Sequence, residues 1–317
     1  MKTISIVTPC YNEEASISEC IDAVRSVFRE RLASYSLEHI FCDNASTDRT
    51  VEILKSYAEK DPSVKIIVNS RNFGILKNNF NGVLNTSGDA VVLFLPADLQ
   101  DPPDLIPDFV KFWEQGYEVV YGLRAKREEG LILRLTRKLY YRILSRLAYV
   151  EYPPDAGDFQ LVDRRVVDVL KRFSDVQPFM RMMTFDAGFR SIGVKYSWRA
   201  RKHGKSHNRL PEMLRQGIGG IVSYSGAPVR LALLFGLLIA AMSLFFAVCV
   251  MVLVLIGHIE TPRGVPTIIV ALFFFGGVQL FFIGIVGEYI LAIYNQVRRR
   301  PLVIERERYN FDKVITK

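Results

Sequence analysis

Acidic and amide side chains follow a stretch of sequence that is typical of a buried strand. Residues 90–94 (AVVLF) are apolar, and the segment LPADLQDPP at 95–103 comes directly after them. Carboxylate and amide oxygens are the ligands that hard divalent cations prefer in proteins. Asp98 is the main candidate, because an acid that follows a continuous apolar strand is not explained by solvation alone. The loop is therefore predicted to bind a metal ion, and Asp101 is expected to cap the helix that the two prolines begin.

Charged residues also follow three other predicted strands. The clusters are Glu13 and Glu14 after 4–7, Asp43 and Asp48 after 40–42, and Arg124 after 118–121. Acids in a first helical turn or at a helix cap have simple structural explanations, and a lone arginine is often a solvated surface residue. A basic loop at 199–208 (RARKHGKSHN) adds further cations. Acids that hold a cation beside several arginines form a site for a diphosphate, because metal and guanidinium together neutralise phosphate oxygens.

Several common catalytic motifs are absent from the sequence. There is no GxxxxGK[ST] loop, which argues against a P-loop NTPase, and no GxGxxG after the first strand, which argues against a dinucleotide-dependent oxidoreductase. There is no GxSxG elbow, and the four histidines show no zinc spacing. The four cysteines are scattered, as expected for buried thiols in a reducing compartment. Group transfer from a nucleotide-diphosphate donor is the chemistry that remains.

The elements that would position these residues alternate between strand and helix patterns. Strands separated by helical patterns of about 10–15 residues indicate a doubly wound, mostly parallel α/β sheet. In such sheets ligands bind beyond the carboxyl ends of the strands, which is where the polar clusters lie. The predicted strands are 4–7, 40–42, 64–68, 90–95 and 118–121, with helices near 75–86, 103–115 and 131–149, a loop at 155–159 and a helix from about 163.

Two long uncharged segments follow this region. Residues 231–257 and 264–287 contain 27 and 24 residues without a formal charge, and about 20 apolar residues suffice to span a bilayer. Arginines flank the pair on both outer sides, whereas the connector at 258–263 is nearly neutral. Because positive flanks stay on the cytoplasmic side, we expect a multi-pass protein of the inner (plasma) membrane, with its catalytic domain and both termini in the cytoplasm.

The chain is thus expected to contain four segments. These are a cytosolic domain (1–208), an amphipathic juxtamembrane helix (209–228), two transmembrane helices (229–295, with spans at about 229–257 and 265–290) and a basic cytosolic C-terminal tail (296–317). Much of the basic excess behind the net charge of +8 lies beside the membrane, where it favours anionic headgroups. The sequence has no basic-aromatic module for nucleic acid, so no such partner is expected.

Five motifs, in order along the chain, resemble those of a known family. They are VTPCYNEE (7–14), CDNASTD (42–48), ADLQDPP (97–103), DAGDFQL (155–161) and RKHGKS (201–206). With the two apolar segments that follow, the chain resembles the polyisoprenyl-phosphate glycosyltransferases of glycosyltransferase family 2. It is similar in particular to bacterial bactoprenol (undecaprenyl-phosphate) glucosyltransferases, with dolichol-phosphate mannose synthase as a cousin. The resemblance covers essentially the whole chain and implies a GT-A (Rossmann-like) domain with a C-terminal two-helix transmembrane hairpin.

The resemblance also implies roles for individual residues. The residues implied to bind the nucleotide-sugar donor are Pro9, Tyr11, Asn12, Glu13, Asp43, Ser46, Ala97, Asp98, Gln100, Arg124, Arg201 and Ser206. Asp98 and Gln100 would face Mg²⁺ or Mn²⁺ and the donor diphosphate, while Asp43 would hydrogen-bond the base. The arginines in this set would contact phosphates. Asp98 and Asp158 are the implied catalytic residues, with Asp158 close to the reacting sugar.

The implied reaction transfers a sugar, with UDP-glucose as the favoured donor, onto the phosphate of a polyprenyl lipid with inversion at the anomeric carbon. A phosphate with a second pKa of about 6 is already largely ionised near neutral pH, so it needs no general base. Asp158 is accordingly assigned to orientation of metal or substrate. The alternatives are transfer of mannose or another sugar from a GDP- or UDP-donor, a processive polysaccharide synthase, although the chain lacks the QxxRW motif of such enzymes, and a non-catalytic nucleotide-sugar sensor. Relatives suggest a homo-tetramer.

One position departs clearly from the family pattern. The family usually has Asp-Ala-Asp where this chain has Pro96-Ala97-Asp98. Asp98 then becomes the main protein carboxylate of the loop, with Gln100 and the donor's own oxygens completing the metal shell. We therefore predict a weak metal site that forms fully only when donor is bound. The second motif also has Asn44-Ala45 in place of the more usual Asp-Gly.

Overall fold

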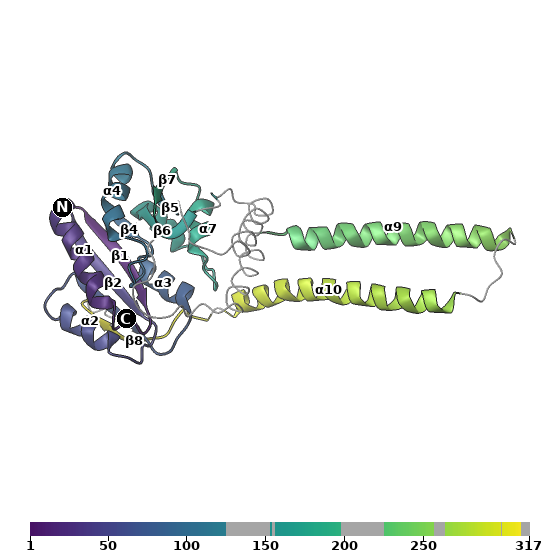
Figure 1. The fold of residues 1–317 in the computed structure, drawn as a ribbon, viewed down its shortest axis with the longest axis horizontal. Coiled ribbons are helices and arrows are strands. Elements are labelled where there is room, and N and C mark those ends of the chain that lie inside the picture. The colour runs from purple at the N-terminus through teal and green to yellow at the C-terminus, as the bar shows by residue number, and fades with distance from the viewer. Residues whose placement is uncertain (125–152, 154–155, 198–224, 257–263, 299, 312–317) are drawn as a thin grey trace. The chain divides into compact units, whose positions relative to one another are not determined.

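The computed structural model describes residues 1–124, 153, 156–197, 225–256, 264–298 and 300–311 of the chain (Figure 1). The chain divides into two compact units. The sheet unit comprises residues 1–145, 150–214 and 299–317, and the helical unit comprises 146–149 and 215–298.

The sheet unit is built on one mixed sheet of eight strands. The strand order is β7-β5-β6-β4-β1-β2-β3-β8. The pairs β1–β2, β2–β3, β1–β4 and β5–β7 are parallel, and the pairs that involve β6 or β8 are antiparallel. The strands are β1 (Thr3–Cys10), β2 (Ser36–Asp43), β3 (Val64–Asn69), β4 (Ala90–Val92), β5 (Val119–Arg124), β6 (Ala156–Asp163), β7 (Ser191–Tyr196) and β8 (Glu305–Tyr309). The predicted mostly parallel α/β fold is confirmed.

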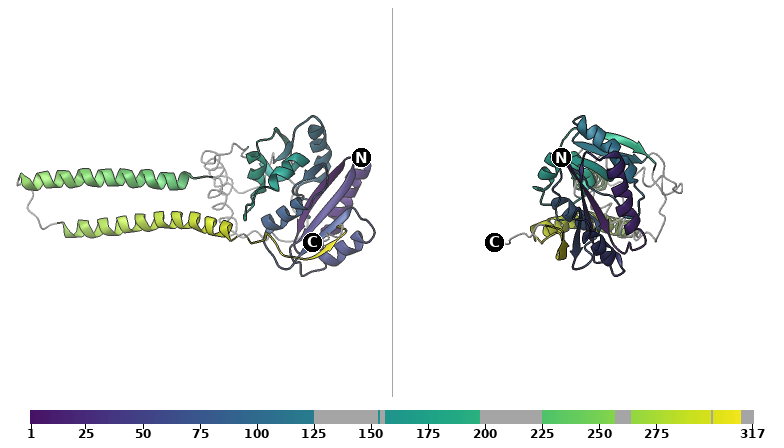
Figure 2. Two further views of the ribbon diagram at one scale, coloured as in Figure 1. Left: turned by 180° about the vertical axis from the view of Figure 1, so that it is seen from behind. Right: turned by 90° about the vertical axis from the view of Figure 1, so that its left-hand side faces the viewer.

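Helices cover both faces of this sheet (Figure 2). The helices α1 (Ile17–Arg31), α2 (Thr50–Ala58) and α4 (Ile106–Glu114), with the short 3₁₀ turn η1 (Pro103–Leu105), contact one another on one face. The other face carries α3 (Ile75–Leu84), α6 (Arg164–Leu170) and α7 (Met180–Asp186). The helices predicted near 75–86, near 103–115 and from about 163 are confirmed, and the helix predicted at 131–149 lies outside the described residues.

The loop predicted at 155–159 is wrong, because Ala156–Asp163 is strand β6. Its residues Gly157 and Asp158 have low strand propensity, which explains the error. The strand is stabilised instead by its position between β4 and β5, where Val162 pairs with both Val91 and Val119. This antiparallel insertion has a consequence for the site. It turns the amino end of β6 toward the edge at which the parallel strands end.

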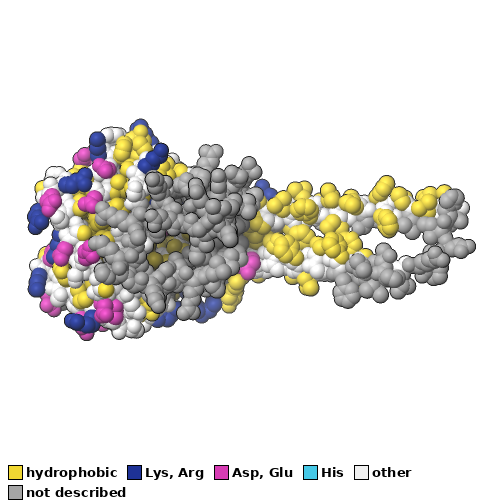
Figure 3. Space-filling model, viewed as in Figure 1, with side chains coloured by type: hydrophobic (Ala, Val, Ile, Leu, Met, Phe, Trp, Pro, Cys, Tyr) yellow, Lys and Arg dark blue, Asp and Glu magenta, His cyan; other side chains and the backbone are white. Residues whose placement is uncertain are grey.

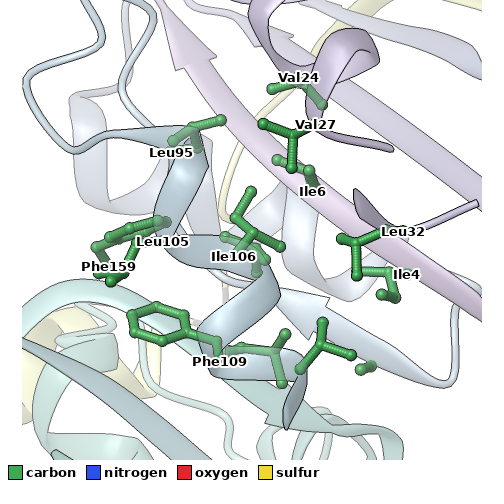
Figure 4. Packing of buried hydrophobic residues seen from close by; sticks show 14 of the residues in the cluster. Ile4, Ile6, Val24, Val27, Leu32, Leu95, Leu105, Ile106, Phe109 and Phe159 are labelled. Carbon is green, nitrogen blue, oxygen red and sulfur yellow. The ribbon is translucent and has the colours of Figure 1, made fainter. Parts of the chain in front are cut away.

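The main hydrophobic core lies between the sheet and the face covered by α1 and α4. Figure 4 shows Ile4 and Ile6 of β1 packed with residues from both helices. The rings of Phe109 on α4 and Phe159 on β6 lie 5.0 Å apart between their centroids and are both fully buried. Burial of large apolar side chains on this scale is the dominant stabilising term of such a fold. The core therefore gives β6 a fixed position beside the parallel strands.

A buried histidine in this sheet provides a direct link between pH and stability. His39 on β2 is fully buried, its Nε2 lies 2.9 Å from Thr8 Oγ1, and its ring centroid lies 4.0 Å from that of Phe41. Burial, helped by the charge of Arg25, lowers the pKa of His39 from 6.5 to about 3. The folded chain therefore holds this imidazole neutral at pH values where the unfolded chain protonates it.

We expect the His39→Gln variant to lose less stability than the parent chain between pH 7 and pH 5. The unfolded chain binds a proton at His39 below about pH 6.5 and the folded chain does not, so acidification favours unfolding, by about 2 kcal/mol at pH 5. Glutamine can still bond to Thr8 but does not titrate. Chemical unfolding of both proteins across this range measures the difference. Parallel stability profiles would contradict the assignment.

The last strand of the sheet comes from the segment predicted as a basic tail. β8 pairs antiparallel with β3, and Ser70 N donates to Ile304 O at 2.9 Å. Lys55 Nζ lies 2.9 Å from Glu307 Oε2, so α2 also holds the strand. Asn310 Nδ2 donates to two backbone carbonyls of the sheet unit, at 2.7 and 2.8 Å. After the second long helix, the chain thus rejoins the sheet beside β3.

Truncation after Pro301 is expected to lower the melting temperature of the detergent-solubilised protein by about 5–10 °C, because it removes the β8 hydrogen bonds and ion pair. It also exposes the edge of β3. A chain truncated after Phe311 keeps β8 and is the matched control. Differential scanning fluorimetry and light scattering should report lower stability and aggregation only for the shorter chain. Equal melting temperatures would show that β8 contributes little.

The helical unit contains two long apolar helices, α9 (Ala227–Leu255) and α10 (Val265–Val297). They correspond to the two predicted spans. The Tyr289 hydroxyl donates to Ser225 O, so the start of α9 lies beside α10 about two turns before α10 ends. At about 1.5 Å per residue each helix exceeds the roughly 30 Å hydrocarbon core of a bilayer. Figure 3 shows hydrophobic side chains over the described parts of both helices, whereas charged side chains gather on the sheet unit.

Among the described residues, one helix segment, Phe274–Val297, is long and apolar enough to cross a membrane by length and composition, and Ala227–Ile239 is a shorter apolar helix. Membrane insertion of the pair therefore stays a prediction. The predicted amphipathic helix at 209–228 falls almost entirely outside the described residues.

Candidate active site

The carboxyl ends of the parallel strands lie along one edge of the sheet. The loops that the sequence analysis singled out follow the strands there. Cys10 at the end of β1 pairs with Asp43 at the end of β2, and Arg124 at the end of β5 pairs with Tyr196 at the end of β7. The loop after β4 begins at the same edge, since Leu95 N donates to Val7 O at 2.9 Å. β6 contributes its amino end there because it runs antiparallel to β4 and β5. This edge is the candidate active site.

The loops after β1 and β2 are joined by side-chain to backbone hydrogen bonds. Asn12 N donates to Ser46 Oγ at 2.9 Å, and Asn12 Oδ1 accepts from Thr47 N at 2.8 Å. Glu13 N donates to Thr50 Oγ1 at 2.8 Å. The structure therefore brings together three of the predicted donor-binding residues, Asn12, Glu13 and Ser46. Two others belong to the same edge, since Pro9 is buried in β1 and Tyr11 is half-buried just after it.

Asp43 is fully buried at the end of β2 and forms hydrogen bonds with the loop that follows this strand. Its carboxylate accepts from Ser46 N at 3.0 Å and also from the Ser46 hydroxyl. Burial raises the pKa of Asp43, and the two bonds from Ser46 oppose that shift. Such bonds stabilise the ionised form of a buried carboxylate. The pair Asp43–Ser46 thus holds the shape of this loop, and the predicted bond to a nucleobase stays a prediction.

A chain of buried amides extends the same arrangement to the end of β3. Asn44 Oδ1 accepts from Phe73 N at 2.9 Å and from Asn69 Nδ2 at 3.2 Å. Asn69 Nδ2 also donates to Asn78 Oδ1, whose own amide donates to Cys42 O, both at 2.7 Å. Amide side chains can bridge backbone groups that belong to no helix or ladder. The network therefore positions the loop after β3 against the loop after β2.

The loop LPADLQDPP contains both candidate metal ligands, Asp98 and Gln100, within one turn. Gln100 N donates to Asp98 Oδ1 at 3.2 Å, and both side chains are half-buried, while Ala97 is buried. No group of three or more histidine, cysteine, aspartate or glutamate side chains within metal-binding distance occurs in the described part of the chain. A carboxylate and an amide oxygen still fit a cation such as Mg²⁺, which keeps several waters and takes substrate phosphates as ligands. Asp98 and Gln100 would hold that ion, which would neutralise charge on a diphosphate.

Backbone strain is concentrated in the same loops. Asn12, Ala45 and Leu99 have positive φ values of 55°, 64° and 55°. Residues other than glycine adopt this conformation at a cost of about 1–2 kcal/mol each, and such residues cluster at functional sites. Each of the three follows a different strand, β1, β2 or β4. The surrounding hydrogen bonds hold three strained loops at one edge, as expected of a preorganised binding site.

Arg124 belongs to a buried polar cluster that the sequence analysis did not foresee. Its Nη2 donates to both carboxylate oxygens of Asp101, at 3.0 and 3.2 Å, and its Nε donates to the Tyr196 hydroxyl at 3.0 Å. The Tyr196 hydroxyl in turn donates to Asp101. The predicted helix cap at Asp101 is therefore wrong, because both carboxylate oxygens accept from these side chains and the residue before η1 is Pro102, which makes no side-chain cap.

The electrostatics of this cluster keep the guanidinium charged. Burial alone would lower the pKa of Arg124, but Asp101 and Tyr196 raise it overall. Burial and the neighbouring Asp101 charge raise the pKa of Tyr196 far above its ordinary value, so its hydroxyl stays protonated. The side chains of Arg124 and Asp101 are 17% and 1% exposed. Arg124 is thus a fixed positive charge at this edge, and its contact with a phosphate stays a prediction.

A second ion pair lies beside the first. Asp158 on β6 accepts from Arg181 through both carboxylate oxygens, at 3.2 Å to Nε and 2.5 Å to Nη2. The charge of Asp158 is also among the causes that raise the pKa of Arg124. Asp158 therefore interacts with the charges of both Arg181 and Arg124. Asp158 is part of the predicted set, whereas Arg181 is not. A single arginine inside the apolar run FMRMM (179–183) was the available signal.

The structure therefore brings ten of the twelve predicted donor-binding residues to one sheet edge, and Asp158 lies there too. Arg201 and Ser206 are outside the described residues. Sequence reasoning missed Asp101 as the partner of Arg124, and it also missed Tyr196 and Arg181. Each of these residues acts through a contact between segments far apart in the sequence.

Oxygen ligands for a cation, fixed arginines and strained loops at the carboxyl ends of parallel strands are suited to a nucleoside diphosphate linked to a sugar. With the GT-A arrangement of the sheet, they define a glycosyltransferase. The sequence profile described as "Glycosyl transferase family 2" matches residues 5–170 of the chain. The chain belongs to glycosyltransferase family 2.

Curated relatives match almost the whole chain. It is 37% identical to an uncharacterized glycosyltransferase, YkcC, of Bacillus subtilis over 97% of this chain and 94% of that protein. It is 33% identical to a SfII prophage-derived bactoprenol glucosyl transferase of Shigella flexneri over 95% of this chain and 96% of that protein. Among solved structures, glucosyl-3-phosphoglycerate synthase of Mycobacterium tuberculosis, in complex with Mn²⁺, UDP and glucosyl-3-phosphoglycerate, is 24% identical, with a TM-score of 0.46, over 71% of this chain and 80% of that chain.

Proposed function

We propose that this protein is a membrane-bound inverting glycosyltransferase that moves glucose from UDP-glucose onto the phosphate of a polyprenyl lipid. The observation that carries the proposal is the extent of the similarity to bactoprenol glucosyl transferases. The match covers 95% of this chain and 96% of the Shigella flexneri protein. It therefore extends beyond the catalytic sheet and through both apolar helices. A shared acceptor that lies in the membrane explains why the helices are part of the match.

The proposed reaction forms one bond and breaks one bond. An oxygen of the lipid phosphate bonds to the anomeric carbon of the sugar, and the bond from that carbon to the diphosphate oxygen breaks with its electron pair leaving on the diphosphate. Arg124, fixed by Asp101 and Tyr196, is placed to stabilise the charge that grows on the leaving group. Asp98 and Gln100 would hold a divalent cation with the same effect. Asp158 would orient the metal or the sugar.

The connectivity of the sheet supports a hairpin topology. β7 precedes both long helices and β8 follows them, yet both strands belong to one sheet. The chain must therefore cross a membrane an even number of times between them. If α10 spans the bilayer, α9 spans it as well, and the sheet unit lies on a single side. The arginines after α10 (Arg298, Arg300, Arg306) favour the cytoplasmic side for that unit.

Transfer is tested with purified full-length protein in detergent. The protein is incubated with labelled UDP-glucose, undecaprenyl phosphate and Mg²⁺ or Mn²⁺, and label is counted in the organic phase. Parallel reactions with other UDP- and GDP-sugars identify the donor. Label in long polymer would indicate a processive synthase. Tight nucleotide binding without transfer from any donor would indicate a sensor and overturn the proposal. Size measurement of the same sample tests the predicted homo-tetramer.

A further inference from the structure

Arg181 is held in place more firmly than a surface arginine would be. It is the second residue of α7, and neighbours of Arg181 on that helix are tied to other elements. Thr184 Oγ1 donates to Gln160 Oε1 of β6 at 2.8 Å, and Asn79 Nδ2 of α3 lies 3.8 Å from Met180 Sδ. Met180, Thr184 and Gln160 are all buried. The backbone that carries Arg181 therefore cannot shift easily relative to β6.

The ion pair between Arg181 and Asp158 requires desolvation of two charges, so it is expected to add little net stability to the fold. The side chains of Arg181 and Asp158 are 12% and 28% exposed, so both charges are partly removed from water. Desolvation often cancels the attraction in such a pair, and apolar residues would stabilise the fold as well. The two-point geometry instead fixes the orientation of a carboxylate. Asp158 also retains some exposure at the sheet edge, where the donor sugar is expected.

Asp158 lies near enough to Arg124 for its charge to act on the guanidinium. The neighbouring Gly157 lies close to Arg124, since a Cβ there would be in ordinary contact with Gly122 O at 3.4 Å and with Arg124 Nε at 3.8 Å. A carboxylate that could rotate at this point would be drawn to the Arg124 guanidinium and compete there with a phosphate. The bond to Arg181 satisfies both oxygens of Asp158 from the other direction.

We propose that Arg181 is a positioning residue of the transfer reaction, which holds the Asp158 carboxylate in one orientation at the sheet edge. This inference rests on the proposed function, because it assigns Asp158 to the reacting sugar. Arg181 acts through Asp158 and touches no substrate itself. Its removal should therefore affect the rate of transfer more than the binding of donor.

The test compares Arg181→Met, Arg181→Lys, Asp158→Asn and the double variant Arg181→Met/Asp158→Asn in the full-length protein. Arg172→Met is the matched control, since Arg172 is exposed just after α6. We expect Arg181→Met to lower kcat about 100-fold, as misplacement of a reacting geometry does, with the KM for donor changed less than about threefold. Arg181→Lys should recover part of the loss. The double variant should be no slower than the slower single variant.

Normal transfer by both the parent and Arg181→Met would overturn the inference, and so would two further results. One is a loss of activity in Arg181→Met that matches a loss of folded protein, measured by melting temperature, without recovery in Arg181→Lys. The other is a double variant whose loss is the product of the two single losses, because that would mean that Arg181 acts independently of Asp158. If the parent protein itself transfers no sugar, the proposed function fails instead. Normal transfer by the parent and by Arg181→Met contradicts only the role of Arg181.

Discussion

Replacing Asp98 by asparagine is expected to lower the rate of sugar transfer by about 10²–10³-fold, while the protein stays folded. Asparagine keeps an oxygen that can accept the hydrogen bond from Gln100 N, so the strained turn at Leu99 is retained. The substitution removes the negative charge that a divalent cation requires. Because Pro96 occupies the position of a second acid, no neighbouring carboxylate in the PAD triplet can compensate. Asp104→Asn, an exposed acid in η1, is the matched control.

The affinity for Mn²⁺ can be compared between Asp98→Asn and the parent protein without any sugar transfer. Titration of Mn²⁺, followed by electron paramagnetic resonance or calorimetry, should detect weak binding to the free protein and tighter binding when UDP is present. Asp98→Asn should remove the UDP-dependent increase. Near-normal transfer by this variant would contradict the metal assignment. Tight binding of Mn²⁺ without nucleotide would contradict the expectation of a site completed by the donor.

The second large effect is expected at Asp101. Asp101→Asn removes the charge that compensates a guanidinium only 17% exposed, and breaking such a pair on one side costs about 3 kcal/mol or more. Transfer should fall as well, because Arg124 loses the partner that fixes its direction. Tyr196→Phe removes a single hydroxyl from the same cluster and should cost about 1 kcal/mol. Urea unfolding and the transfer assay measure both quantities for each variant.

A double variant separates the structural role of Asp101 from its functional role. In Asp101→Asn/Arg124→Met no unpaired charge is left buried, so stability should recover relative to Asp101→Asn alone. Transfer should not recover, because the guanidinium itself is gone. Recovery of both would mean that Arg124 serves the fold alone. Equal stability of Asp101→Asn and the parent chain would contradict the importance of the buried pair.

The parts of the fold that could be predicted from sequence are those encoded by local apolar runs. β1 to β5 each contain such a run, because a parallel strand covered on both faces must be apolar along its length. β6 and β8 could not be found in this way. Gly157, Asp158 and the charged residues of β8 are poor local signals, and these strands form only because a partner strand from a distant segment is already in place.

The site residues also fall into those that local sequence predicts and those that depend on contacts between distant segments. Asp43, Asp98 and Arg124 could be proposed because each directly follows or ends a predicted strand, and the carboxyl edge of a parallel sheet is a known place for ligands. Their partners could not, since an ion pair between Asp101 and Arg124, or between Asp158 and Arg181, depends on which strands become neighbours. Asp101 was misjudged for this reason. Its local sequence is that of a helix cap, but the nearby β5 and β7 supply stronger partners for its carboxylate.

The position of β8 has a consequence for the order in which the protein is made. β1 to β7 are translated before the two long helices, and β8 is translated only after them. Until then the edge of β3 stays open, with backbone groups that can pair with another chain. A nascent chain that stops within the helices, or whose end is left on the wrong side of a bilayer, cannot close this edge. Closure of the sheet therefore requires that the chain has been made as far as β8, and a chain that stops earlier leaves the edge of β3 exposed.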